Sequence, residues 1–302
     1  MGFRLFAPTI PRMIKALILL LRPAHWVKNV FVLAPLVFAR KLTDPEAVHL
    51  ALLAFVAFCL ASSAVYVFND IRDRAEDRLH PLKRNRPLAA GTVSVQPAAV
   101  LAVALAAGAL AIAVRLGAGF LLVMTAYLVL NQLYSMGLKH VVILDVMMVS
   151  LGFVLRVVAG GMAIDVQISA WLLLCTFFVA LFLAFSKRRH ELMLLTSEAS
   201  GQRPVLSHYS PAFLDQMINV VTASTVVAYA VYSISPETVE KFHTRHLIYT
   251  LPMVLFGIFR YLYLIYQQQT TRNPTEAILR DPPFLINILI WAVAVLWIVY
   301  SG

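Results

Sequence analysis

The feature of this sequence that most constrains its fold is a series of long apolar blocks separated by short polar segments. Hydrophobic residues make up 61% of the 302 residues, charged residues make up 13%, and the mean hydropathy is +0.80. Helices of about 20 apolar residues are long enough to cross a membrane. The predicted spans are 15–38, 47–68, 97–114, 117–135, 141–163, 169–186, 214–234, 247–267 and 284–301. The sequence therefore predicts an all-α polytopic membrane protein: about nine transmembrane helices in one bundle, forming a single domain over residues 1–302.

The placement of positive charge predicts how this bundle is oriented. The net charge is +10, and most of the 25 Lys and Arg residues fall on the side of the N-terminus when the spans alternate. The positive-inside rule places that side in the cytoplasm of a cell (inner) membrane protein. The predicted cytoplasmic loops are 69–96, 136–140, 187–213 and 268–283. Because the charges flank apolar blocks, they indicate a membrane surface as partner and no nucleic acid.

An acidic cluster directly follows the second predicted span. Asp70, Asp73 and Asp77 have the spacing i, i+3, i+7, so on a continuous helix they lie within about 60° of one another. Carboxylates this close repel one another unless a cation lies among them, and oxygen ligands suit Mg²⁺, with Mn²⁺ as the alternative metal. The competing interpretation is a solvated helix end whose acids pair with the neighbouring arginines. The triple spacing favours the metal site.

Basic residues next to this cluster are candidates for binding phosphate. Lys83 and Arg86 follow it in a loop stiffened by Pro81 and Pro87, and Arg86 has the geometry for bidentate phosphate contacts. His80, beside Pro81, is interpreted as a hydrogen-bonding loop residue or a phosphate contact. The alternative for all of these residues is ordinary positive charge on a cytoplasmic loop.

Further polar residues lie at the ends of spans or within them. Asp145 and Arg156 fall on one face of the fifth span, and intramembrane charges usually face a polar cavity. We expect both to line a cavity, and we interpret Arg260 in the eighth span in the same way. The candidates at span ends are Lys28 and Asn29, Tyr134 and Lys139, and Lys187 and Arg188.

The run from Asn69 to Asp77, followed by Arg86-Pro87-Leu88-Ala89-Ala90-Gly91, resembles the first signature of the UbiA-type intramembrane prenyltransferase superfamily. This resemblance implies a helical bundle in which Mg²⁺ binds a diphosphate leaving group. The second signature of ordinary members, D-x-x-x-D after the sixth span, is not matched. Ser186-Lys187-Arg188-Arg189 stands there instead, which argues against a prenyl diphosphate held by two acidic motifs.

Other segments resemble one branch, the decaprenyl-phosphate phosphoribosyltransferases. They are Arg22 to Asn29, His80 to Lys83, Tyr134 with Lys139, Leu155-Arg156, Lys187-Arg188-Arg189 and Phe259-Arg260-Tyr261. The resemblance implies a Mg²⁺-dependent glycosyltransferase that moves the 5-phosphoribosyl group of phosphoribosyl pyrophosphate (PRPP) to a polyprenyl (decaprenyl) phosphate for arabinan and cell-wall precursors, releasing pyrophosphate.

On this hypothesis each candidate residue has a role. The catalytic, metal-binding residues are Asp70, Asp73 and Asp77. The residues expected to bind the phosphates of PRPP are Asn69, Lys83, Arg86, Tyr134, Lys139 and Arg156. The residues expected to bind the lipid phosphate are Lys28, Asn29, Lys187 and Arg188.

Two other functions compete with this one. A prenyltransferase acting on an aromatic or quinone precursor requires the second acidic motif. A transporter predicts inverted repeats with broken helices, and the sequence shows no convincing repeat. The lipid chain length, the number of metal ions and the oligomeric state are left open.

Overall fold

The protein is a bundle of membrane-length helices. The computed structural model describes residues 10–79, 83–195, 204–267 and 280–301. In these ranges it contains no β-strand and has nine helical segments long and apolar enough to cross a membrane. Seven lie within single helices: α3 (Pro45–Arg72), α5 (Val95–Arg115), α6 (Ala118–Met136), α7 (Leu144–Ala163), α8 (Ala170–Leu195), α9 (Pro211–Ile234) and α13 (Pro282–Ser301). The span before α13 joins η4 (His246–Thr250) to α11 (Leu251–Gln267). The predicted fold class and the spans are thus confirmed.

The ends of several helices follow from local sequence. Asp44 caps α3 by accepting hydrogen bonds from the N–H groups of Glu46 and Ala47, and Pro45 occupies the first turn, where its missing N–H costs nothing. Ser210 precedes Pro211 at the start of α9 in the same arrangement. Short elements complete the connections. They are α4 (Arg74–Leu79), η2 (Leu138–His140), η3 (Pro204–His208), α10 (Pro236–Phe242) and η4 (His246–Thr250).

The sixth span differs from the prediction at one end. Residues 187–195 were expected in a loop because their charges end the apolar run, but α8 continues through them to Leu195. The side chains of Lys187 and Arg188 therefore lie on a helix, where Glu191 follows at i+4 and i+3 and can pair with both.

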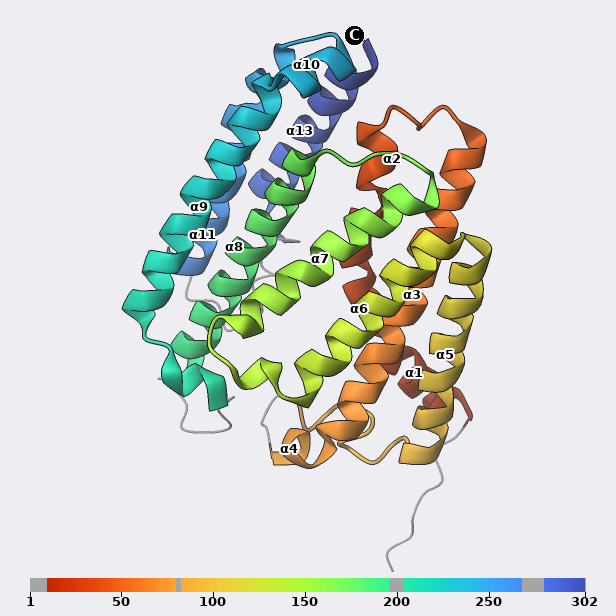
Figure 1. The fold of residues 1–302 in the computed structure, drawn as a ribbon. Helices are drawn as coiled ribbons and strands as arrows, with labels where there is room; N and C mark the ends of the chain where they lie inside the picture. The colour runs from red at the N-terminus through yellow and green to blue at the C-terminus, as the bar shows by residue number, and fades with distance from the viewer. Residues whose placement is uncertain (1–9, 80–82, 196–203, 268–279, 302) are drawn as a thin grey trace, which may run out of the picture.

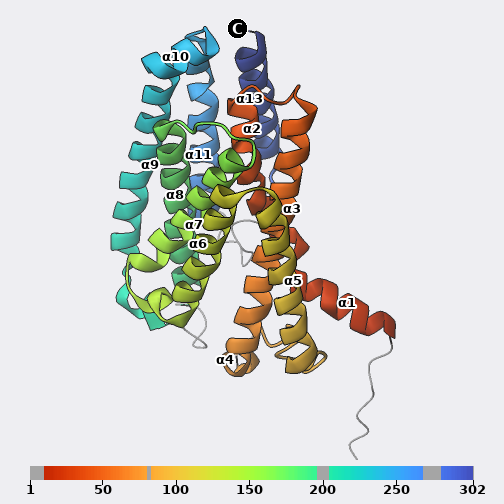
Figure 2. The same cartoon turned by 45° about the vertical axis from the view of Figure 1, so that its right-hand side comes forward.

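The first span is not one regular helix. It consists of α1 (Ile10–Leu21), the 3₁₀ helix η1 (Pro23–Leu33) and α2 (Ala34–Phe38). Arg22 has a left-handed backbone (φ 51°) and separates α1 from η1, and Figure 2 shows α1 pointing away from the bundle. A 3₁₀ run of 11 residues is unusual, since such runs rarely exceed about four residues.

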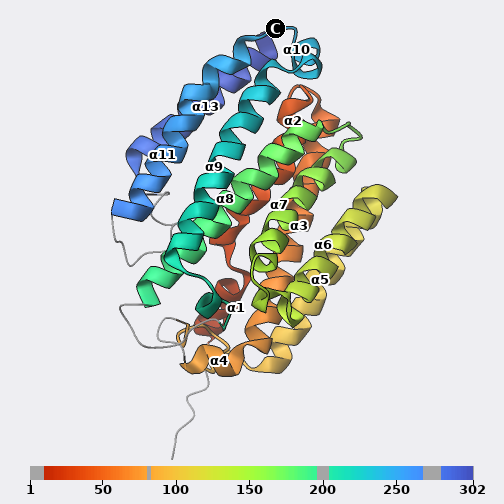
Figure 3. The same cartoon turned by 60° about the vertical axis from the view of Figure 1, so that its left-hand side comes forward.

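Helix α3 lies at the centre of one half of the bundle. It buries an alanine stripe that includes Ala47, Ala51, Ala54 and Ala61, and small residues allow close helix packing in membranes. One apolar cluster joins α3 to η1, α5, α6 and α7, and a second joins α8, α9 and α11. Figure 3 shows α5 and α6 on one side of the bundle and α11 and α13 on the other.

One end of the bundle collects the polar elements. The C-termini of α3, α6 and α8 and the N-terminus of α7 lie there together with α4, whereas α10 and the C-terminus lie at the opposite end (Figure 1). We call the first of these the aspartate end, because it carries Asp70, Asp73 and Asp77.

Candidate active site

The acidic cluster spans a break between two helices. Asp70 lies in α3, Asp73 is the residue after its last turn, and Asp77 lies in α4. The backbone hydrogen bond from the Asp77 N–H to the Asp73 carbonyl is kept, but Asp73 leaves helical geometry (φ −85°, ψ 7°). The prediction of one continuous helix is therefore wrong at Asp73.

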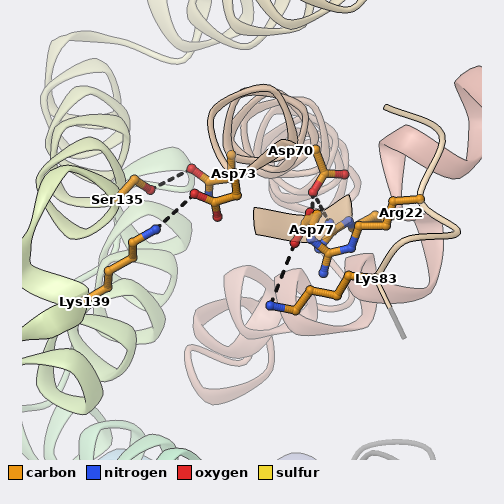
Figure 4. Close-up of polar contacts among 9 residues, drawn as sticks. Arg22, Asp70, Asp73, Asp77, Lys83, Ser135 and Lys139 are labelled. Carbon is orange, nitrogen blue, oxygen red and sulfur yellow. Dashed lines mark hydrogen bonds and ion pairs between the residues drawn. The ribbon is translucent and has the colours of Figure 1, made fainter. Parts of the chain in front are cut away.

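Asp70 and Asp77 share one guanidinium group. A single terminal nitrogen of Arg86 donates to Asp70 Oδ1 at 3.1 Å and to Asp77 Oδ2 at 2.7 Å. Arg22 also pairs with Asp70, and Lys83 Nζ lies 3.9 Å from Asp77 (Figure 4). Both carboxylates are buried, so this concentration of positive charge offsets the cost of removing them from water.

Asp73 turns to the other side of α3 (Figure 4). Its carboxylate accepts a hydrogen bond from Lys139 Nζ at 3.1 Å, and its side chain is 29% exposed. Beside it, Ser135 donates to the side-chain oxygen of Asn69 at 2.6 Å. Lys139 and Ser135 come from η2 and the end of α6, so the structure brings these two segments to the acidic cluster.

The side chains present fit an oxygen-preferring cation only in part. Among the described residues no three His, Cys, Asp or Glu side chains form a metal-binding group, so the expected triad of carboxylates on one helix face is not formed. However, Asp70 and Asp77 both lie within bonding distance of one positively charged nitrogen. A cation at that position would meet two carboxylates, and such an all-oxygen donor set suits Mg²⁺.

A second polar group lies deeper in the bundle, around Arg156. This side chain is 6% exposed. It donates to Asn29 Oδ1, to the Gly152 carbonyl and to the Tyr127 hydroxyl at 2.8–2.9 Å, and its guanidinium lies over the Tyr127 ring. Asn29 and Arg156 were assigned to different phosphates from the sequence, but the structure places them in direct contact.

Helix η1 connects this deeper group to the acidic cluster. At its start, Arg22 pairs with Asp70. Along its length, Trp26 donates to Ser63 at 3.0 Å and Asn29 donates to Ser62 at 3.2 Å. Hydrogen bonds from Trp26 and Asn29 thus hold η1 against α3 between Asp70 and the Arg156 group.

A third polar group surrounds Arg188. Its guanidinium, on a side chain only 4% exposed, bonds Asp145 at 2.6 Å, Glu191 at 2.9 Å and Tyr134 at 3.2 Å. The sequence placed Asp145 on a cavity-lining face with Arg156, but the structure pairs Asp145 with Arg188. Lys187 is 46% exposed, with Glu191 at 3.7 Å.

Tyr209 completes this group and was not anticipated from the sequence. Its hydroxyl donates to Asp145 Oδ1 at 2.7 Å and accepts the Ile143 N–H at 2.7 Å. Burial, together with the hydrogen bond to Asp145, raises the pKa of Tyr209, so the phenol stays protonated and remains a donor. Ile143, which precedes α7, has φ 69°, a strained value for a β-branched residue. No local sequence signal marks this contact, because it joins segments 66 residues apart.

Two candidates remain. Arg260 does not line the site: it pairs with Asp281 at 2.8 Å and so joins α11 to the start of α13. His80 lies outside the described residues, as does most of the predicted loop 268–283.

Comparison with known proteins places this arrangement in a family. The model of the UbiA prenyltransferase family matches residues 30–289. Decaprenyl-phosphate phosphoribosyltransferase of Mycolicibacterium smegmatis is 36% identical over 92% of this chain and 91% of its own length. The Corynebacterium glutamicum protein of the same name is 35% identical over 95% of this chain and 86% of its own.

Solved structures agree at the level of the fold. A UbiA homolog from Archaeoglobus fulgidus bound to GPP and Mg²⁺ has a TM-score of 0.71 at 22% identity, covering 95% of this chain and all of that one. With the family match extending over most of the sequence, the chain belongs to the UbiA prenyltransferase family.

Proposed function

We propose that this protein is a glycosyltransferase that moves the 5-phosphoribosyl group of PRPP to the phosphate of a polyprenyl phosphate and releases pyrophosphate. The observation that carries the proposal is its similarity, over nearly the whole chain, to enzymes named decaprenyl-phosphate phosphoribosyltransferase. The site supports it, because the end of α8 carries Lys187, Arg188 and Arg189 where a second acidic motif would hold a prenyl diphosphate.

In the proposed reaction the bond between ribose C1 and the diphosphate oxygen breaks, and the diphosphate leaves with the electron pair. A lipid phosphate oxygen forms the new bond to C1. That oxygen is already ionised at neutral pH, so no general base is required. Mg²⁺ held by Asp70 and Asp77 would offset the charge that develops on the leaving group; the A. fulgidus homolog was solved with Mg²⁺ and GPP. Asp73, on the other side of α3, would orient Lys139.

The surrounding cations have separate tasks in this proposal. Arg86 and Lys83, already beside Asp77, bind diphosphate oxygens, and charge-assisted hydrogen bonds of this kind are the strongest that side chains make. Lys139 lies on the opposite side of α3, beside Asp73, and binds the diphosphate from that side. Asn69, oriented by Ser135, and Tyr134 bind the ribosyl end.

The lipid phosphate is proposed to bind where α8 leaves the membrane. Lys187 is well exposed there, and Arg188 holds its helix in place through Asp145. Positive charge at a membrane surface attracts an anionic lipid headgroup. We place this end of the bundle at the cytoplasmic face of the cell membrane, where soluble PRPP is available.

The test uses purified protein in detergent, with Mg²⁺, ribose-labelled PRPP and decaprenyl phosphate. We expect the label to move into the lipid phase, pyrophosphate to appear in equal amount, and EDTA to abolish both. If the label stays in the aqueous phase while a prenyl diphosphate is consumed on an aromatic acceptor, the protein is instead a prenyltransferase.

A further inference from the structure

Two cations, the buried Arg156 of α7 and the partly buried Lys28 of η1, have no acidic partner among the described residues. Neither Arg156 nor Lys28 forms an ion pair within the described residues, although Arg156 is almost fully buried. Lys28 lies on η1 directly before Asn29, which bonds Arg156. The hydrogen-bond partners of Arg156 are neutral oxygens.

Such an arrangement is unfavourable unless an anion joins it. Buried charges in proteins are normally paired, because removing an ion from water has a large cost. Arg22 satisfies this rule through Asp70. Arg156 and Lys28 do not, and charged residues within membrane spans commonly mark a ligand site. These two side chains therefore call for an anion.

The position of the pair limits the choice of anion. Asn29, which bonds Arg156, also donates to Ser62 and Cys59 of α3. These residues precede Asp70 by two to three helical turns, so the pair lies roughly 12–16 Å from the level of Asp70 along the helix axis. A sugar with phosphates at opposite ends can bridge such a separation, with its diphosphate at the aspartates.

We propose that Lys28 and Arg156 bind the phosphate monoester at C5 of the pentosyl donor, the end opposite its diphosphate. This inference rests on the proposed function and adds a basis for donor selection. A donor with an apolar prenyl tail would leave both cations without a counterion, whereas a donor with a second phosphate neutralises them. Lys28 and Asn29, assigned to the lipid phosphate from the sequence, then belong to the donor site.

The experiment compares two donors in four proteins. The donors are PRPP and ribosyl 1-diphosphate, which lacks the C5 phosphate. The proteins are the wild type, Lys28→Gln, Arg156→Gln and Arg115→Gln, the last removing an exposed positive charge at the far end of α5. For each, kcat/KM is measured with both donors, together with the KM for polyprenyl phosphate.

In the wild type and in Arg115→Gln we expect loss of the C5 phosphate to reduce kcat/KM by about 100-fold, as for a lost charge-assisted contact. In Lys28→Gln and Arg156→Gln the reduction should fall to about 10-fold, because one of the two cations is gone. A fifth protein, Lys28→Arg, keeps the positive charge and should show the wild-type preference. Should Arg156→Gln not fold, the Lys28 variants carry the test.

Two results would overturn the inference. The first is an equal penalty for the missing C5 phosphate in all four proteins. The second is a raised KM for polyprenyl phosphate with an unchanged donor preference, which would assign the pair to the lipid phosphate. Failure of the wild type to use PRPP at all would instead reject the proposed function.

Discussion

Replacing Gly160 with alanine should both destabilise the protein and slow its reaction. Gly160 lies in α7 where that helix crosses η1, and a Cβ added there would lie 1.9 Å from the carbonyl oxygen of Val32 and 2.9 Å from its carbon. Both are backbone atoms and cannot rotate away. Helix η1 would have to move from α7 by roughly 1 Å, which is a severe case of overpacking.

The size of both effects follows from this contact. Overpacking a close-packed core typically costs 1–3 kcal/mol, and a clash with backbone on both sides predicts about 3 kcal/mol here. The same shift would move Asn29 from Arg156, which it bonds at 2.8 Å. Misplacement of substrate-positioning groups by about 1 Å can reduce turnover about 100-fold.

The assay is thermal unfolding in detergent, followed by turnover at a temperature where the variant is folded. Gly108→Ala is the matched control, since a Cβ there would meet only the Leu60 side chain at an ordinary 3.5 Å. In a helix this change should be neutral or stabilise by up to about 1 kcal/mol. If Gly160→Ala unfolds at the wild-type temperature and keeps full turnover, the contact between η1 and α7 does not organise the site.

Three further substitutions probe the aspartate end. Asp73→Asn should lower kcat about 100-fold, because Lys139 loses the carboxylate that positions it, without a shift in unfolding temperature, because Asp73 is partly exposed. Arg86→Gln should tighten Mn²⁺ binding, measured by electron paramagnetic resonance without substrate, because it removes the charged nitrogen between Asp70 and Asp77. The same change should raise the KM for PRPP, since a cation proposed to bind the diphosphate is lost. Weaker Mn²⁺ binding would contradict this reasoning. Asp145→Asn should destabilise by about 3 kcal/mol by leaving the buried Arg188 poorly compensated, and adding Arg188→Gln should recover part of the loss in chemical unfolding.

The parts of the fold that sequence predicts are those that depend on neighbours along the chain. The helical spans follow from local hydropathy, and the acidic cluster is visible because its three aspartates lie within eight residues of sequence. Even there, the spacing of the aspartates does not predict the helix break at Asp73. The backbone hydrogen bonds on either side of the break are those of a continuous helix.

The pairing of buried charges could not be predicted in this way. Arg188 and Asp145 are 43 residues apart, and Arg156 and Asn29 are 127 apart. Helical spacing gives the face on which each side chain lies, but not which helix lies opposite. That choice depends on the packing of α7 against α8 and η1, which is set by apolar contacts distributed over the whole bundle.

The first span, expected as one of nine helices, carries residues of both the acidic cluster and the deeper Arg156 group on an irregular backbone. Irregular backbone at membrane depth is tolerated where protein covers it, and η1 is covered on one face, where Asn29 and Val32 are buried. Ser63 accepts from Trp26 and donates to the Leu21 carbonyl at 2.8 Å, and Gly160 leaves room for the Val32 carbonyl. Because a 3₁₀ helix rises about 2.0 Å per residue against 1.5 Å in an α-helix, η1 can carry Arg22 to Asp70 and Asn29 to Arg156 with fewer residues. The unusual geometry thus sets the distance between the two phosphate-binding ends of the proposed donor site.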